Sequence, residues 1–210
     1  MTIQLPPAPQ RSQARANRAK ILAAAREELA RDSEASLEEI ARAAGVVRRT
    51  VYGHFPNRQA LLEALAVEAS EALALSVQDA RHPDDAPAAA LARLVVAAWP
   101  VGDRYRMLIS LGRRDLGEQI IRDALAPGRT AATAIIIEGQ RDGVFADHLP
   151  PEILNMAIEG LMLALLDTAA TSGTPTVDGG TAATAVLIAA GLEREVARAT
   201  ADAVGAGSAG

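Results

Sequence analysis

The tightest constraint on the fold is a turn of only two residues between two short helical patterns. The first pattern is SLEEIARAAG at 36–45, in which apolar residues recur at helical spacing. The second is RRTVYGHF at 48–55. Only Val46 and Val47 lie between them. Two short helices that meet at such a turn form a helix-turn-helix, so we expect this unit near the N-terminus.

The ends of these two helices carry their own signals. Ser36 and Glu39 have the spacing of a capping box, which favours a helix start directly after Ser36. Gly45 favours the end of that helix, because glycine readily adopts the left-handed conformation that follows many helices. We expect apolar side chains from both helices to form a small core. These side chains are Leu37, Ile40, Ala41, Ala44, Val46, Val51 and Phe55.

Further helical patterns flank this unit. Residues 1–13 contain three prolines and are expected to form a flexible arm, and a first helix is expected from about 14 to 32. Pro56 ends the helix before it, and Asn57 can cap a long helix that runs to about 81 and joins two parts of the molecule. Later helices are expected near 86–98, 103–112, 115–125, 129–141, 151–172 and 180–203.

The sequence has no alternating strand pattern, so the expected fold is all-α. We expect a three-helix N-terminal domain at 14–58 and a larger helical domain at 59–205. Half of the residues are hydrophobic, but only 2% are aromatic. The core must therefore consist of Ala, Leu, Val and Ile, a composition that favours helices.

Composition also excludes several classes of site. The chain has no cysteine, which excludes disulfides, thiolate metal sites and cysteine nucleophiles. His54, His82 and His148 lie in unrelated segments, without the spacing of a catalytic or metal site. We therefore expect no enzyme activity, no metal and no cofactor. No apolar run has the length of a membrane span or the pattern of a signal peptide, which predicts a soluble, cytoplasmic protein.

The two parts of the chain differ in charge. Residues 1–58 contain ten Arg and Lys against six Asp and Glu, a formal charge of +4. Residues 59–210 contain eleven against twenty, a formal charge of −9. A basic N-terminal part on an acidic body indicates a polyanionic partner for the N-terminal part alone.

The second helix of a helix-turn-helix enters the major groove of DNA. Arg48 and Arg49 lie in its first turn, where they can reach guanine N7 and O6 or a phosphate. Thr50 and Tyr52 carry hydroxyls suited to phosphate oxygens. His54 is a further candidate, or it only covers the apolar core. The sequence therefore predicts a double-stranded DNA interface on this helix.

The run from 18 to 62 carries a characteristic set of residues: Ile21, Leu22, Ala25, Leu37, Ile40, Ala41, Gly45, Val46, Thr50, Val51, Tyr52, His54, Phe55, Arg58, Leu61 and Leu62. With these residues the run resembles the DNA-binding domain of the TetR family of bacterial transcriptional regulators. The resemblance implies a DNA-binding domain at 14–58 and a ligand-binding and dimerisation domain at 59–205. It also implies an all-helical homodimer that binds a palindromic operator, usually as a repressor, and leaves it when a small-molecule effector enters the C-terminal domain.

Three positions differ from the family's usual pattern. Val47 replaces a residue that can cap the recognition helix, which costs about 1 kcal/mol. Arg49 replaces a smaller residue and adds a cation at the groove. Arg58 stands where lysine is usual and retains the positive charge that the resemblance directs at a DNA phosphate.

The C-terminal part carries weaker signals. A ligand pocket between helices is mostly apolar with a few polar groups. Met and aromatic side chains adapt to ligands, but a Met at helical spacing is more often a core residue. Glu159 lies on an otherwise apolar helix and either receives a cationic or hydroxylated ligand or faces solvent. The scarcity of aromatics argues against a flat cationic dye. The candidate pocket residues are Trp99, Tyr105, Met107, Met156, Glu159 and Met162.

The segments at 151–172 and 180–203 are apolar around most of their circumference, so both must be buried. We expect them to form a four-helix interface in a homodimer, with intramolecular core as the alternative. Two further functions remain open: a constitutive or architectural DNA-binding dimer without a ligand, and an activator.

Overall fold

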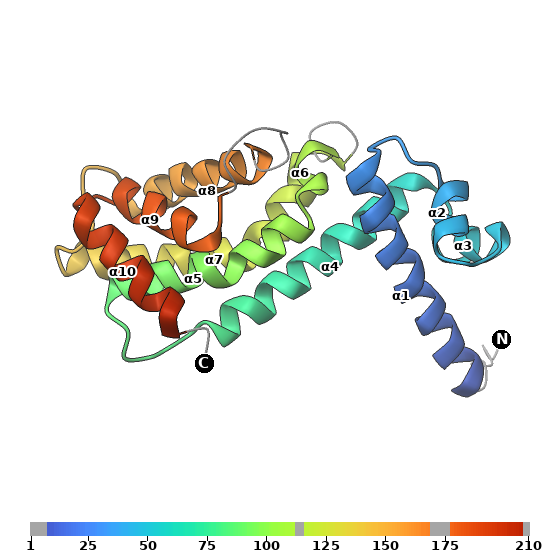
Figure 1. Cartoon of the computed structure of the whole chain (residues 1–210), viewed down its shortest axis with the longest axis horizontal. Coiled ribbons are helices and arrows are strands. Elements are labelled where there is room, and N and C mark those ends of the chain that lie inside the picture. Colours follow the sequence, from blue (N-terminus) through green and yellow to red (C-terminus); the bar gives the residue numbers. More distant parts are fainter. Residues whose placement is uncertain (1–7, 112–115, 169–176, 208–210) are drawn as a thin grey trace, which may run out of the picture.

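The structure, a computed structural model, describes residues 8–111, 116–168 and 177–207. All regular secondary structure in these ranges is helical, which confirms the predicted all-α fold. A small N-terminal domain lies at one end, and a larger helical domain forms the rest (Figure 1). Within the described residues, no helix combines the length and the apolar character needed to cross a bilayer.

The N-terminal domain consists of α1 (Ala8–Arg31), α2 (Leu37–Ala43) and α3 (Arg48–His54). Helix α1 begins six residues earlier than expected, so the prediction of an arm is wrong for residues 8–13. Pro9 is compatible with this early start, because backbone N–H groups in the first turn of a helix have no partner within the helix. Residues 1–7 of the expected arm lie outside the described residues. The three helices enclose a small core that includes Ile21, Leu22, Leu29, Ile40, Val51 and Phe55.

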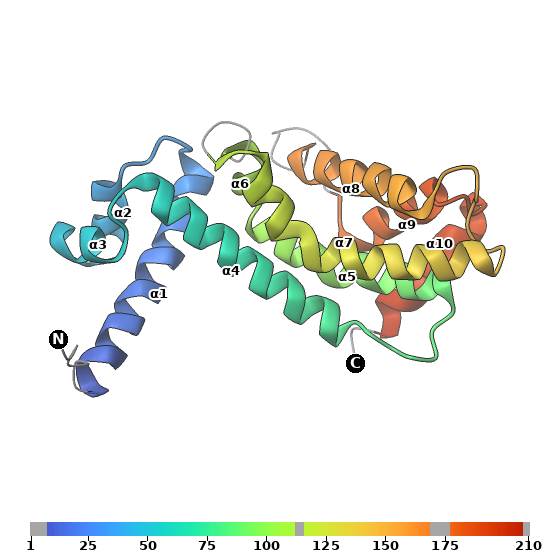
Figure 2. The same cartoon turned by 180° about the vertical axis from the view of Figure 1, so that it is seen from behind.

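Helix α4 (Arg58–Asp79) runs from the N-terminal domain into the C-terminal domain (Figures 1 and 2). It begins where the sequence predicted, because Asn57 Oδ1 accepts a hydrogen bond of 2.8 Å from the backbone N–H of Ala60. Leu61 and Leu65 are buried in the N-terminal core. Leu73, two turns further on, lines a cavity in the C-terminal domain. One continuous helix therefore contributes to both domains.

The C-terminal domain is built around α5 (Pro87–Arg104). Helices α9 (Gly179–Ala189) and α10 (Arg194–Gly207) pack on one side of α5, and α4 and α7 (Glu118–Arg141) pack on the other (Figures 1 and 2). The short α6 (Met107–Leu111) follows α5, and α8 (Pro151–Thr168) packs against α7 and α9.

Two expected helix breaks are absent. Helix α5 continues through Pro100, and α7 continues through Pro127, so the predicted ends near 98 and 125 are wrong. The glycines that follow these prolines do not end the helices but allow neighbouring side chains to pack closely. A Cβ atom on Gly102 would lie 2.7 Å from Leu166 Cδ1, and one on Gly128 would lie 3.3 Å from Leu73 Cδ2. Burial against neighbouring helices stabilises both helices despite the prolines.

One predicted helix is divided instead. The segment at 180–203 forms α9 and α10, because the chain turns at Gly191 with a φ of +106°. A Cβ atom at this position would lie 2.7 Å from Ala146 Cβ. Only glycine combines that backbone conformation with such a close approach. The described part of α8 ends at Thr168, and the expected extension to 172 lies outside the described residues.

Candidate DNA-binding surface and ligand cavity

The helix-turn-helix forms as its sequence signals predict. The backbone N–H of Glu39 donates to Ser36 Oγ at 3.3 Å, and the backbone N–H of Ser36 donates to Glu39 Oε2 at 2.8 Å. This reciprocal capping box starts α2, and Gly45 ends it with a φ of +65°. Val47 precedes α3 without a side-chain capping bond, as its residue type predicted. The local sequence therefore determines how α3 is presented.

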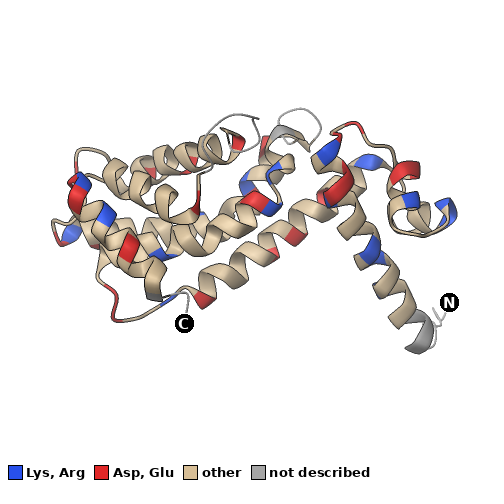
Figure 3. Ribbon diagram, in the orientation of Figure 1, with Lys and Arg blue, Asp and Glu red and all other residues tan. Residues whose placement is uncertain are grey.

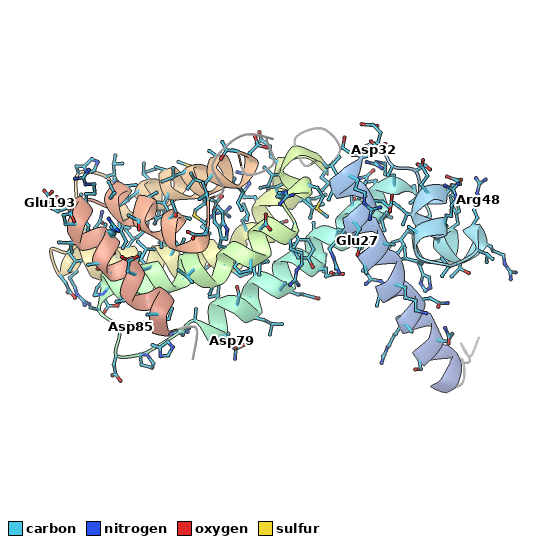
Figure 4. The ribbon with its side chains drawn as sticks, viewed as in Figure 1. Glu27, Asp32, Arg48, Asp79, Asp85 and Glu193 are labelled. Carbon is cyan, nitrogen blue, oxygen red and sulfur yellow. The ribbon has the colours of Figure 1, made fainter. Side chains whose placement is uncertain are left out.

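The first turn of α3 presents two arginines to solvent. The Arg48 side chain is 68% exposed, and Arg49 is also exposed. Figure 4 shows Arg48 at the outer end of the N-terminal domain, pointing away from the body of the molecule. Arg49 makes no ion pair or hydrogen bond with any part of the chain that the structure describes. Both side chains can reach a large external partner.

Arg48 belongs to a surface cluster that sequence reasoning missed. Its Nη2 lies 2.8 Å from Glu38 Oε1, and the Tyr52 hydroxyl donates to the same oxygen at 3.0 Å. The Arg48 guanidinium carbon lies 5.1 Å from the centre of the Tyr52 ring. A backbone hydrogen bond, the Tyr52 hydroxyl and the charge of Arg48 together lower the pKa of Glu38. Glu38 thus orients both predicted DNA-contacting side chains.

The other predicted DNA contacts are less exposed. Thr50 and His54 are half-buried, and the His54 ring centre lies 6.2 Å from that of the buried Phe55. Arg58 Nη1 donates to the Ala35 carbonyl at 2.5 Å, and Nη2 donates to the Ser33 carbonyl. Arg58 therefore secures the loop between α1 and α2, and its contact with DNA stays a prediction. Figure 3 shows the Arg and Lys residues of α1 and α3 on this domain.

A cavity of about 170 Å³ lies in the C-terminal domain between α4, α5, α6, α7 and α8. All but four of its lining residues are apolar or glycine. The four exceptions are Tyr105, Arg129, Asn155 and Glu159.

Three of the six expected pocket residues line this cavity: Tyr105, Glu159 and Met162. The other three do not line it. Trp99 is buried where α5 meets Gly179, Met107 is buried in the core shared with the N-terminal domain, and Met156 is 63% exposed. Residue type identified side chains that suit a pocket, but it did not indicate which way each one faces. Arg129 and Asn155 were missed for the same reason.

The charged groups of the cavity neutralise each other. Arg129 Nε and Nη2 each lie 2.8 Å from a carboxylate oxygen of Glu159, and Arg129 Nη1 donates to the Arg122 carbonyl at 3.1 Å. The hydrogen bonds to Glu159 raise the pKa of Arg129. This two-point pairing joins residues 30 positions apart on α7 and α8. No local sequence signal could reveal it.

Tyr105 connects the cavity to the N-terminal domain. Its hydroxyl donates to Glu68 Oε1 of α4 at 2.6 Å, and Arg26 of α1 forms an ion pair with the same oxygen. The Arg26 guanidinium carbon lies 5.7 Å from the centre of the Tyr105 ring. Burial, with the hydrogen bond to Glu68, raises the pKa of Tyr105 to about 12. One side chain thus faces the cavity and contacts a pair that includes α1.

Comparisons with known proteins agree with this architecture. The family model for bacterial regulatory proteins of the tetR family matches residues 21–65. Among curated proteins, none matches the sequence.

Several solved structures share the fold along most of the chain. The transcriptional regulator FadR from Bacillus subtilis, in complex with stearoyl-CoA, is 19% identical over 82% of this chain and 97% of its own, with a TM-score of 0.67. A tetR-family regulatory protein from Rhodococcus RHA1 is 22% identical over 90% and 94%, with a TM-score of 0.65. RolR, in complex with resorcinol, is 20% identical over 90% and 95%, with a TM-score of 0.55.

The family match covers the domain that carries α2 and α3, and the likeness of fold extends over both domains. Residues 21–65 therefore match the N-terminal domain of the tetR family of bacterial regulatory proteins, and the chain as a whole shares its fold with solved tetR-family regulators.

Proposed function

We propose that this chain is a dimeric repressor that binds a palindromic operator and leaves it when a small molecule occupies the C-terminal cavity. The observation that carries the proposal is the position of Tyr105, which lines the cavity and bonds to the Glu68–Arg26 pair at the N-terminal domain. The cavity and the DNA-binding surface thereby share a physical connection.

The exposed face of α3 supports sequence-specific DNA binding. Arginine is suited to bidentate bonds with guanine in the major groove. We assign base reading to Arg48 and Arg49 because both extend from the first turn of α3. We assign phosphate contacts to Tyr52, with Thr50, His54 and Arg58 at the edge of the surface. Operator recognition then depends on the direction that Glu38 imposes on Arg48.

Exposed apolar side chains support dimerisation through α8, α9 and α10. Ile153 and Met156 on α8, Ile188 on α9 and Val196 on α10 all face solvent in the single chain. A contiguous surface of such side chains is one that a partner covers, and we propose that these four form one. One face of α9 is already buried within the chain, so α8 and α10 contribute most of the proposed interface. The buried residues of α9 are Ala182, Ala183, Val186 and Leu187. A dimer would place two α3 helices about one DNA turn apart.

The connection at Tyr105 supports coupling between ligand and DNA. A ligand that displaces the Tyr105 ring weakens the hydrogen bond to Glu68 and frees Arg26 to move with α1. A ligand that binds the released form about 100-fold more tightly shifts the equilibrium by about 2.7 kcal/mol. FadR and RolR, which share this fold, were solved with stearoyl-CoA and resorcinol, and this supports ligand binding by a chain of this fold.

Selection of bound duplexes from a random DNA pool, followed by sequencing, tests the proposed function. The expected result is an enriched palindrome whose half-sites lie about one turn apart. Recovery of DNA without a shared motif would indicate an architectural binder, and no recovery would contradict DNA binding by α3. A compound that raises Tm and weakens operator binding would exclude the constitutive alternative.

A further inference from the structure

Asn155 is a buried polar residue that lines the apolar cavity. It is 3% exposed and the only polar or charged residue that is fully buried among the described residues. Its Nδ2 donates to the Arg129 carbonyl at 2.9 Å and to Thr133 Oγ1 at 2.7 Å. A carbonyl oxygen can only accept, so the nitrogen of the amide must face α7 and Oδ1 must face the other way.

Asn155 Oδ1 has no hydrogen-bond donor in the part of the chain that the structure describes. No fully enclosed side-chain nitrogen or oxygen of the described residues lacks a partner. The Oδ1 atom is therefore not fully enclosed, and the space that its residue lines is the cavity. The cavity thus presents one hydrogen-bond acceptor that no protein group satisfies.

The other polar groups of the cavity are already engaged. Arg129 and Glu159 cancel each other's charge, and each guanidinium nitrogen of Arg129 makes a hydrogen bond. The Tyr105 hydroxyl donates to Glu68. An ionic ligand would therefore lose its hydration without gaining an unpaired counter-charge, which is unfavourable in an apolar site. Tyr105 is also the only aromatic lining residue among those described, so stacking contributes little.

We propose that the effector is an uncharged, mainly aliphatic molecule with a hydroxyl group that donates a hydrogen bond to Asn155 Oδ1. This inference rests on the proposed ligand-binding function and specifies the chemistry of that same cavity. The aliphatic part of the molecule contacts the Leu, Ile, Val and Ala side chains of the lining. The hydroxyl supplies the donor that Asn155 lacks.

Four probes with similar chains test this class: octan-1-ol, its isomer 1-methoxyheptane, octanoate and octylammonium. The dissociation constant of each is measured from the rise in Tm of the full chain with probe concentration. Octan-1-ol is expected to bind about tenfold more tightly than the ether, because the ether cannot donate a hydrogen bond. Octanoate and octylammonium are expected to bind more weakly than the alcohol.

Three outcomes would overturn the proposal. The ether could bind as tightly as the alcohol, an ionic probe could bind most tightly, or no probe could raise Tm. The Asn155→Leu variant is expected to lose the preference for alcohol over ether. Thr133→Val is the matched control, because it removes one bond of Asn155 Nδ2 and retains Oδ1. Its preference is expected to remain about tenfold.

A third variant keeps the proposal testable if Asn155→Leu does not fold. Glu159→Gln leaves the charge of Arg129 uncompensated, so octanoate should gain affinity relative to octan-1-ol. An unchanged ratio of these two affinities would contradict the role of the neutral pair. Operator binding is measured separately. A probe that binds with the expected preference but leaves operator affinity unchanged would contradict the repressor mechanism and leave the ligand class intact.

Discussion

The N-terminal and C-terminal domains use polar residues in opposite ways. On the N-terminal domain, Arg49 extends into solvent without a partner among the described residues, and Arg48 is 68% exposed although it pairs with Glu38. In the C-terminal domain, Arg129 is held by Glu159 beside an apolar cavity. A surface that binds a polyanion needs uncompensated cations, whereas a cavity for a neutral ligand needs its charges balanced. The two functions therefore require different electrostatics from the same residue type.

The largest expected effect tests the exposed side of this comparison. Arg48→Ala and Arg49→Ala should each weaken operator binding by about 1–3 kcal/mol and relax preference at particular base pairs, because each removes a base-reading group. Fluorescence anisotropy on the selected operator and on single-base variants measures both effects. Arg141→Ala removes an arginine of matching exposure, 69%, from the C-terminal end of α7 and should leave DNA affinity unchanged. Retention of full base preference in both variants would disprove the assignment.

The second prediction contrasts a local turn with a long-range contact. Gly45 and Gly191 both have positive φ. A Cβ atom on Gly45 would have no neighbour within 4 Å, whereas one on Gly191 would lie 2.7 Å from Ala146 Cβ. Gly45→Ala should cost about 1 kcal/mol of unfolding free energy from the left-handed conformation alone. Gly191→Ala adds a clash and should cost about 2–3 kcal/mol.

Urea denaturation measures the free energy of unfolding for both variants. Gly205→Ala on α10 is the control, because that glycine has ordinary backbone angles and open space around its Cβ position. Alanine is the better helix former, so this variant should be at least as stable as the parent. Equal losses for Gly45→Ala and Gly191→Ala would show that the contact with Ala146 has no energetic importance.

These glycines show why one domain was more predictable than the other. The capping box of Ser36 and Glu39 and the turn at Gly45 act within a few residues, so the sequence alone indicated the helix-turn-helix. By contrast, α5 continues through Pro100 and α7 through Pro127. Near these prolines, Gly102 and Gly128 pack closely against leucines that are distant in the sequence. Local breaker signals therefore predicted ends that tertiary packing overrides.

The candidate sites follow the same division. The exposed arginines could be predicted because the loop of Val46 and Val47 places them in the first turn of α3. The Arg129–Glu159 pair and the bond from Asn155 to the Arg129 carbonyl join positions 30 and 26 residues apart. Trp99 and Met156 suit a pocket by residue type but do not line this cavity, because residue type does not determine which face of a helix meets it. Glu38 had no signal, because its partner Tyr52 lies 14 residues away.

The third prediction concerns the pH dependence of stability at the connection between the domains. The pKa of Tyr105 is raised to about 12 in the folded chain, above its ordinary value of 10.0. Between these values the unfolded chain releases this proton and the folded chain retains it, so stability should fall as pH rises from about 10 to about 12. Urea midpoints measured at intervals across this range test the expectation. Tyr105→Phe should show a shallower decline, and an equally steep one would contradict it.

The smallest expected effect concerns the exposed cluster on α2 and α3. Glu38→Gln removes the negative charge that pairs with Arg48. Affinity for random-sequence DNA should rise a few-fold at low salt, because exposed ion pairs contribute at most about 1 kcal/mol. Base preference should decrease because Arg48 loses its orientation. Glu138→Gln on α7, which removes the partner of Arg141, is the matched control and should change neither quantity. A fall in nonspecific affinity would contradict this role of Glu38.

We propose that the cavity controls the DNA-binding surface through Tyr105. The most direct test measures the operator dissociation constant with and without saturating octan-1-ol, for the parent and for Tyr105→Phe. In the parent, bound octan-1-ol should weaken operator binding by about tenfold or more. In Tyr105→Phe, octan-1-ol should still raise Tm, but the loss of operator affinity should be much smaller. An operator affinity that is unchanged in the parent, while Tm shows that octan-1-ol is bound, would contradict the account.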